Sequence, residues 1–338
     1  MKPIVQPVGI DVSKKTLDTA LFKPSRFPSR KSANARQDFD PLLAWMQAQA
    51  VGELHVCVEP TGTYHDELVT FLLEHGITVS VVPPSQIASF RHSEGTRHKT
   101  DKQDAILLAK FCQQKQPAAH IPVAEDLAHL RMLLSRLDQL AQMQQAERNR
   151  LENGRLNEAI RVQIAEHRQM LQTWHKQFQE QIRTWIKEHE QMSKAMKLLK
   201  SIKGIGEVSG WYLLAIIGPD ASRFPSAYQL AVYLGLDVVK HDSGTSVRSV
   251  GHISKQGSPR VRGVLGMCAI VAKRWDPDMN QWAGELTGRG KKGLVVRVAV
   301  MRKLLSIAYG VLKSQKAYDP SRAWPTHQQV SQEEQQAA

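Results

Sequence analysis

Between residues 125 and 186 the chain contains one glycine and no proline, and this stretch limits the possible folds more than any other feature. Gln, Glu, Arg, Leu and Met dominate it, and these residues favour helices. Apolar residues recur at alternating steps of three and four, the seam of a coiled coil, at Leu127, Leu130, Leu134, Leu137 and Ala141. After a break near Asn153-Gly154, a second stripe comprises Leu156, Ile160, Ile164, Leu171, Trp174, Phe178, Ile182 and Trp185. We expect two long helices, packed either within one subunit or as a dimer-forming arm.

The N-terminal part of the chain alternates short apolar runs with helical patterns. Residues 4–12 and 16–22 predict a hairpin across the polar segment SKK. Helices are expected around residues 39–46 and over 65–75, and strands over 54–59 and 77–82, the last stopped by Pro83-Pro84. This order predicts an α/β domain with a mixed sheet.

Four acidic residues occupy special places in this pattern. Asp11 and Glu59 each close an apolar run rich in β-branched residues, which indicates a buried strand ending in a carboxylate. Asp101 and Asp104 begin a helical pattern three residues apart, so both project from one helix face. Asp101 also stands where an N-cap residue would. Taken singly, Asp11 could cap the turn at SKK and Glu59 could pair with a nearby cation.

A cluster of these four carboxylates would repel itself unless protons or cations neutralised it. All-oxygen ligation selects a hard ion such as Mg²⁺. Paired divalent ions held by carboxylates serve in-line displacement at phosphorus. The chain has a formal net charge of +13 and a pI near 9.7, so a nucleic acid is the expected partner.

The C-terminal part offers candidate contacts to that partner. Gly204-Ile205-Gly206 lies between two helical patterns and is similar to a helix-hairpin-helix turn, whose amides bind phosphate, although a tight turn alone also explains it. A polar loop and a basic segment without acidic residues over 286–316 follow. The candidate phosphate contacts are Gly204, Gly206, Lys255, Arg260, Arg262, Lys291, Lys292 and Arg302. His98 and Lys99 are expected to contact the nucleic-acid backbone rather than to catalyse.

Composition narrows the class of protein. A chain of 338 residues with 42% hydrophobic and 23% charged residues can form two cored domains. Cys57, Cys112 and Cys268 each lie in an apolar run with neither disulfide nor zinc spacing, which indicates reduced core residues of a cytoplasmic protein. No signal peptide is expected, and no apolar run reaches the length that spans a membrane.

Several motifs together resemble the DEDD-type transposases of insertion sequences, a family that includes Piv-like DNA invertases and bridge-RNA-guided recombinases. The N-terminal half matches through GIDVSKKTLD, VEPTGTYHDEL and KTDKQDA, and the C-terminal half through IKGIGEVSGWYLLAIIG, the SG of HDSGTSV, GHISKQGSPRVR and the KKG…VAVMRKLL segment. The resemblance covers nearly the whole chain, and the order of the motifs makes it specific.

The resemblance implies a RuvC-like (RNase H-like) catalytic domain over residues 1–120, coiled-coil helices over 121–195 and a mainly α-helical transposase domain over 196–320. A disordered tail is expected over 321–338. Asp11, Glu59, Asp101 and Asp104 occupy the DEDD positions. Ser243, which precedes a glycine, occupies the position of the nucleophilic serine; Ser246 lies close by, and the SG dipeptide decides between them.

The implied activity is Mg²⁺-dependent DNA recombination through a covalent phosphoserine. The implied partners are donor and target double-stranded DNA, a structured bridge RNA that selects both, and further copies of the chain, as a dimer or a pair of dimers. A cytoplasmic, nucleoid-associated protein is expected. Since a free hydroxyl needs activation and no base has triad spacing to Ser243, we expect a composite site in which Ser243 meets the carboxylates.

Other functions fit parts of the pattern. A RuvC-like nuclease or junction resolvase would use water as nucleophile, with Ser243 making only a loop hydrogen bond. An actin-like ATPase or sugar kinase would share the GIDVS strand turn, but it needs a second phosphate loop and an adenosine loop that the sequence lacks. A DNA-binding scaffold would use only the basic C-terminal part.

Overall fold

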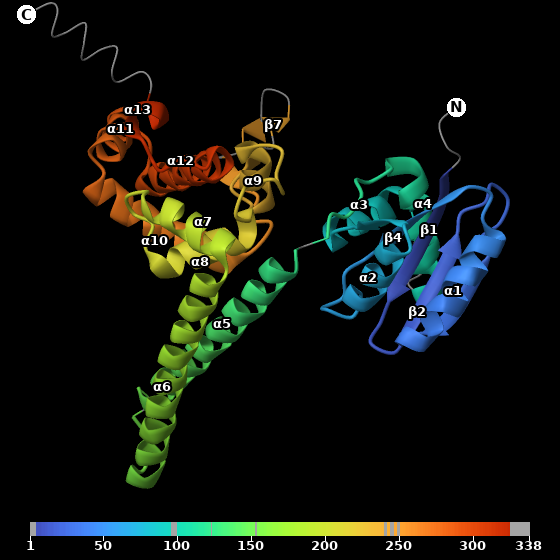
Figure 1. Ribbon diagram of the computed structural model, residues 1–338, viewed down its shortest axis with the longest axis horizontal. Helices are drawn as coiled ribbons and strands as arrows, with labels where there is room; N and C mark the ends of the chain where they lie inside the picture. Colours follow the sequence, from blue (N-terminus) through green and yellow to red (C-terminus); the bar gives the residue numbers. More distant parts are fainter. Residues whose placement is uncertain are drawn as a thin grey trace, which may run out of the picture. The chain divides into compact units, whose positions relative to one another are not determined.

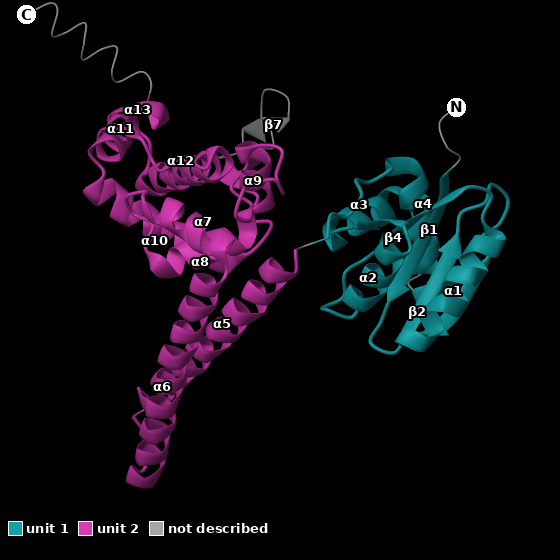
Figure 2. Ribbon diagram, viewed as in Figure 1, with its two compact units in different colours: residues 1–122 teal, residues 123–338 magenta. Residues whose placement is uncertain are grey.

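The computed structural model describes residues 5–95, 100–122, 124–152, 154–239, 242–243, 247–248 and 251–324. The chain divides into two compact units, residues 1–122 (unit 1) and 123–338 (unit 2), shown in Figure 2. The regions expected as a coiled coil and a C-terminal domain share one hydrophobic core, which runs from Leu127 to Trp324.

Unit 1 is an α/β domain built on a mixed five-stranded sheet of order β3-β2-β1-β4-β5. Strands β1, β2 and β3 pair antiparallel, whereas β1, β4 and β5 run parallel. This mixed sheet is consistent with the RuvC-like domain expected from the sequence. In chain order the elements are β1 (Val5–Val12), β2 (Thr16–Leu21), β3 (Ser29–Ala33), α1 (Arg36–Gln49), β4 (Glu53–Val58), α2 (Asp66–Glu74), β5 (Thr78–Val81), α3 (Pro84–Ser93) and α4 (Asp101–Lys115).

The structure confirms the expected hairpin and adds two elements that the sequence pattern did not predict. Strand β3 has the sequence SRKSA, which carries no apolar alternation, and it forms by pairing with β2 at the sheet edge. Helix α3 begins at Pro84, because the proline expected only to stop a strand also suits the first position of a helix.

Side-chain alternation along β1 and β4 assigns each residue to a sheet face. Val8, Ile10 and Val56 belong to the core under α1 and α2, whereas Cys57 packs with residues of α3 and α4. Gly9 lets α4 approach β1 closely, since a Cβ atom there would lie 2.1 Å from the carbonyl oxygen of Ala105. Alternation therefore places Asp11 and Glu59 on the α4 side.

Unit 2 is mainly helical, with two short two-stranded ribbons. Its helices are α5 (Glu125–Leu151), α6 (Glu158–Glu188), α7 (Glu190–Lys200), α8 (Glu207–Ile217), α9 (Ala227–Tyr233), α10 (Pro259–Trp275), α11 (Pro277–Gly288), α12 (Gly293–Ser314) and α13 (Pro320–Ala323). Its strands are β6 (Val238–Val239), β7 (Asp242–Ser243), β8 (Val247–Arg248) and β9 (His252–Ile253).

The two long helices α5 and α6 lie antiparallel, side by side (Figure 1). The amide of Gln144 donates to the carbonyl oxygen of Leu171 at 2.9 Å, and Nδ1 of His167 lies 2.9 Å from the carboxylate of Glu147. The α5 seam is buried in the same core cluster as residues of α6, α7 and α8. Of the two expected arrangements, packing within one subunit accounts for the burial of this seam.

The C-terminal boundary needs a correction. The disordered tail was expected from residue 321, but Pro320–Ala323 form α13 and Trp324 is only 6% exposed. The ring of Trp324 is buried in the core of unit 2, with Nζ of Lys303 4.3 Å from its centroid, so order extends at least to residue 324. Residues 325–338 lie outside the described part of the chain.

Candidate active site

The four acidic residues singled out from the sequence line one cavity in unit 1. Its volume is about 640 Å³, and Asp11, Glu59, Asp101 and Asp104 all contribute to its wall. Asp11 comes from the end of β1, Glu59 follows β4, and the two remaining carboxylates come from the first turn of α4. The Cα partner of Asp11 on β2 is a further acid, Asp18.

The electrostatics of the cavity show that like charges crowd Asp11. Burial, and then the carboxylates of Asp104, Asp101, Glu59 and Asp18, raise the pKa of Asp11 from 3.8 to about 6. The charged form of Asp11 is therefore less stable than that of an isolated aspartate, and a bound cation would relieve this repulsion, as expected of a ligand set for a metal ion.

Two cations offset part of this charge, and the sequence did not reveal either of them. Nη2 of Arg91, in the last turn of α3, lies 2.9 Å from Oδ1 of Asp104. Nζ of Lys31, on β3, lies 3.2 Å from Asp18 and 3.9 Å from Asp101. Both residues come from elements that the sequence pattern did not predict, so no local signal could have placed them.

The structure also removes two alternative roles. The turn after β1 is closed by Ser13, whose Oγ accepts from the amide of Thr16 at 3.0 Å, so Asp11 does not cap it. The N-cap of α4 is Thr100, which accepts from the amide of Gln103 at 3.3 Å, and the expectation that Asp101 serves as the cap is wrong. Asp101 is the first helical residue, and its side chain is 65% exposed at the cavity.

In unit 2, Ser243 lies on β7, paired with Val247 of β8. Gly244 and Ser246 lie outside the described residues, as do His98 and Lys99 of unit 1. The serine loop is the segment between α9 and α10 that contains Ser243, and its base, where the two ends meet near Gly235 and Gly257, is tightly packed. Gly235 has a φ of +65°, and a Cβ atom there would lie 2.0 Å from the carbonyl oxygen of Gln256; at Gly257, with φ +79°, it would lie 2.2 Å from that of Tyr233.

Two arginines proposed as phosphate contacts have structural partners in unit 2. Nη1 of Arg262 donates to the backbone carbonyl oxygens of Gln256, Gly257 and Leu234 at 2.9, 3.0 and 3.2 Å. It therefore ties the start of α10 to the loop base. Nε of Arg260 lies 2.7 Å from Asp138 of α5, and its side chain remains 52% exposed.

The glycine turn between α7 and α8 is also used internally. A Cβ atom on Gly204 would lie 2.7 Å from that of Ala272, so glycine is required for packing against α10. The amide of Gly206 donates to Oγ of Ser209 at 2.9 Å. These contacts favour a packing role for the turn. Among the described residues, Lys255, Lys291 and Lys292 have no ion-pair partner, and Arg302 is half-buried.

Comparison with known proteins adds family information to this geometry. Residues 8–159 match the family model of the DEDD transposase domain of IS110 elements, and residues 196–283 match that of the IS116/IS110/IS902 transposase family. Pilin gene-inverting proteins of Moraxella bovis and Moraxella lacunata are each 31% identical over 320 residues, which is 92% of this chain and 97% of the relatives.

The chain belongs to the IS110 family of transposases. It is an enzyme that acts on DNA by strand cleavage and rejoining. The first matched region contains the four carboxylates of the cavity, and the second contains Ser243, Lys255, Arg260 and Arg262. None of the described helices combines the length and apolar character needed to cross a bilayer.

Proposed function

We propose that this IS110-family enzyme breaks and rejoins DNA strands with Mg²⁺ bound by Asp11, Glu59, Asp101 and Asp104. The observation that carries the proposal is their convergence on one cavity in which like charges raise the pKa of Asp11 to about 6. The donors are all oxygen, which fits a hard divalent ion better than a soft one. When bound, such an ion would polarise the scissile phosphate and help to deprotonate the attacking hydroxyl.

The residues of the cavity supply the remaining chemistry. Asp11, once deprotonated, and Asp104, held by Arg91, would bind the ion from a strand end and a helix start. Arg91 lines the same cavity, and its guanidinium can bind a phosphate oxygen of DNA. In this account Arg91 releases part of its contact with Asp104 as the DNA backbone enters.

We propose Ser243 as the nucleophile, because the resemblance to DEDD-type transposases implies this role for the serine of the SG dipeptide. The lining residues of the described cavity of unit 1 include no serine. Attack by the Ser243 hydroxyl on phosphorus forms a phosphoserine bond and releases a DNA hydroxyl, which keeps the bond energy for rejoining. The serine and the carboxylates belong to different units, so the proposed site is composite and forms when DNA is bound, in cis or between subunits.

The proposed partners follow from charge and family. A net charge of +13 suits duplex DNA and a structured bridge RNA that selects donor and target by base pairing.

Joining two duplexes requires more than one active site, and we propose a dimer or a pair of dimers. Ile160, Val162 and Trp174 of α6 are 42–48% exposed and offer apolar surface for such contacts. The Moraxella relatives are named as DNA-inverting proteins, so inversion is as open to this chain as transposition.

The experiment is strand cleavage by the full chain with its co-purified nucleic acid. We expect the nucleic acid to be a discrete RNA when sequenced, and DNA matching it to be cut with Mg²⁺ but not with a chelator. Cleavage that persists in the chelator would contradict the metal assignment. DNA binding without cleavage under any divalent ion would favour a DNA-binding scaffold. Cleavage of DNA that does not match the RNA would contradict target selection by the RNA.

A further inference from the structure

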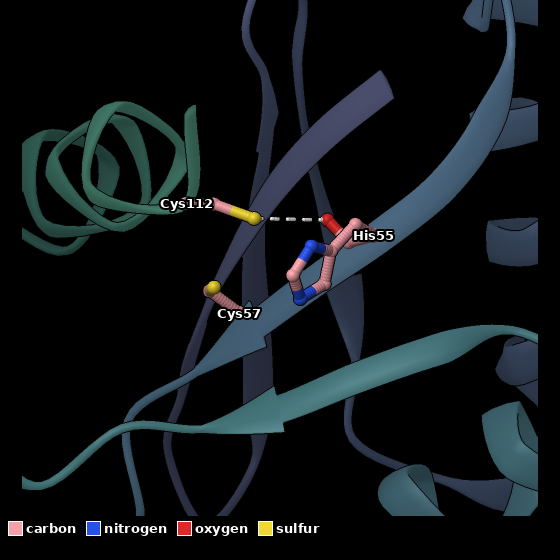
Figure 3. A group of neighbouring side chains, drawn as sticks. All are labelled: His55, Cys57 and Cys112. Atoms are coloured by element: carbon pink, nitrogen blue, oxygen red, sulfur yellow. Dashed lines mark hydrogen bonds between the residues drawn. The ribbon is translucent and has the colours of Figure 1, made fainter. Parts of the chain in front are cut away.

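A second cluster of side chains lies beneath the acidic cavity, on the same face of the sheet. His55 and Cys57 of β4 meet Cys112 of α4, and their ligand atoms all lie within 4.8 Å of one another. Figure 3 shows both sulfur atoms on one side of the imidazole ring. Cys57 and Cys112 are 0% and 1% exposed. None of these three residues has a role in the proposed DNA chemistry.

The hydrogen bonds around His55 fix which ring nitrogen is free to bind. Oγ of Ser80 donates its single hydrogen toward the backbone carbonyl oxygens of Ala118 and Pro117, at 2.8 and 3.1 Å. Oγ must therefore accept from Nε2–H of His55, which lies 2.8 Å away. The neutral imidazole then carries a bare Nδ1, which leaves this nitrogen as the one that can bind a metal ion. A hydrogen bond at the remote nitrogen is the usual companion of a metal-binding histidine.

We propose that His55, Cys57 and Cys112 form a Zn²⁺ site. Binding releases two thiol protons to solvent and involves no redox change, so two thiolates, one neutral imidazole and Zn²⁺ leave no net charge in the buried interior. Ligand atoms around one tetrahedral ion lie about 3.5–3.8 Å apart. The observed limit of 4.8 Å thus requires side-chain movement of no more than about 1 Å.

The position of this site gives it a positioning role. His55 and Cys57 lie on one face of β4, and Glu59 directly follows the end of that strand. Cys112 follows Asp104 on α4 by eight residues, about two helical turns. Zn²⁺ would clamp β4 to α4 and thereby stabilise the two elements that carry three of the four carboxylates. Only this consequence rests on the proposed function; ion binding itself does not.

The test uses Co²⁺ as a spectroscopic probe on the full chain, reduced with a phosphine and stripped of metal. We expect one Co²⁺ per chain to give a thiolate-to-metal charge-transfer band that Zn²⁺ abolishes and excess Mg²⁺ does not. Co²⁺ at the acidic cavity has oxygen ligands and gives no such band. Cys57→Ser and Cys112→Ser should lose the band, whereas Cys268→Ser, at the third buried cysteine, should keep it.

A second measurement needs no variant. Zn²⁺ should raise the melting temperature of the parent protein and slow alkylation of Cys57 and Cys112 but not of Cys268. A folded, reduced parent with no charge-transfer band and no thermal shift would overturn the site, as would a band that survives Cys112→Ser. A Cys57–Cys112 disulfide in the isolated protein, with no Co²⁺ bound after reduction, would replace the metal site with a redox pair.

Discussion

The carboxylates of unit 1 and the serine loop of unit 2 show two ways of placing reactive groups. In unit 1, strand ends and a helix start fix Asp11, Glu59 and Asp104 around a cavity, and Gly9 allows the helix to contact the sheet. In unit 2, Arg262 and two glycines fix only the base of the loop, and Ser243 lies on a strand of two residues beyond it. On the proposed function, unit 1 is a preformed metal-binding half and unit 2 is a nucleophile-bearing half that DNA must bring into position.

The largest effect is expected from removing charge in the preformed half. Asp11→Asn and Asp104→Asn keep side-chain size but lose the charge that holds a hard cation. Cleavage should fall by more than about 100-fold, the upper end for loss of a residue that only supports a metal ligand. Circular dichroism and RNA binding should match the parent, and cleavage rates within a few-fold of the parent would refute the assignment.

Two glycine substitutions, one in each unit, should impair different steps of the reaction. Gly9→Ala should lower the free energy of unfolding by about 1–3 kcal/mol through overpacking, and it should weaken metal binding by displacing α4. Gly235→Ala should leave metal binding unchanged but slow formation of the covalent adduct, because φ is +65° there and the loop base must shift. Denaturant unfolding, calorimetric metal titration and adduct gels provide the readouts.

The control for both is Gly263→Ala. Gly263 lies on α10, and a Cβ atom would meet nothing within 4 Å, so this variant should be neutral or slightly more stable. If Gly9→Ala and Gly235→Ala impaired the same step to the same degree, the distinction between the two halves would fail.

The pH dependence of metal binding gives a smaller, graded effect. Since the folded-state pKa of Asp11 is raised from 3.8 to about 6, Mg²⁺ must displace a proton below pH 6. Apparent affinity should fall roughly tenfold for each pH unit below about 6. In the metal-free protein, the folded state holds the Asp11 proton more tightly than the unfolded state does, and this adds to the free energy of unfolding. The contribution is fully present below pH 3.8 and is lost as the pH rises through 6. Affinity that is constant between pH 5 and 7.5 would contradict the assignment of Asp11 as a ligand.

The smallest effect concerns the basic residues of unit 2. Arg262→Ala should destabilise the protein because three hydrogen bonds to backbone carbonyl oxygens are lost. Lys291→Ala should leave stability unchanged. It should reduce the slope of the logarithm of the DNA-binding constant against the logarithm of salt concentration by about one. Melting curves and DNA binding at several salt concentrations distinguish the two variants. An unchanged melting temperature in Arg262→Ala would favour a phosphate contact over a structural role for Arg262.

The sequence predicted those parts of the molecule that depend on local patterns. The strand ends at Asp11 and Glu59 and the helix start at Asp101 followed from apolar periodicity, and parallel strands deliver such ends to one edge. Pairings between distant segments could not be predicted. Strand β3 is recruited by β2 despite its polar sequence, Arg91 meets Asp104 from an unexpected helix, and Arg262 turned inward to the backbone. The cluster at Cys57 escaped notice because its ligands come from a strand and a helix.

Trapping of the protein–DNA adduct tests the central claim most directly. The parent and three variants, Ser243→Ala, Ser246→Ala and Asp11→Asn, are each mixed with RNA, Mg²⁺ and a DNA substrate that carries a single cut in one strand. The products are then resolved on a denaturing gel. We predict a covalent adduct for the parent and for Ser246→Ala, and none for Ser243→Ala, which should still bind Mg²⁺ with parental affinity. If Ser243→Ala cut DNA at the normal rate, water would be the nucleophile and the chain would act by hydrolysis.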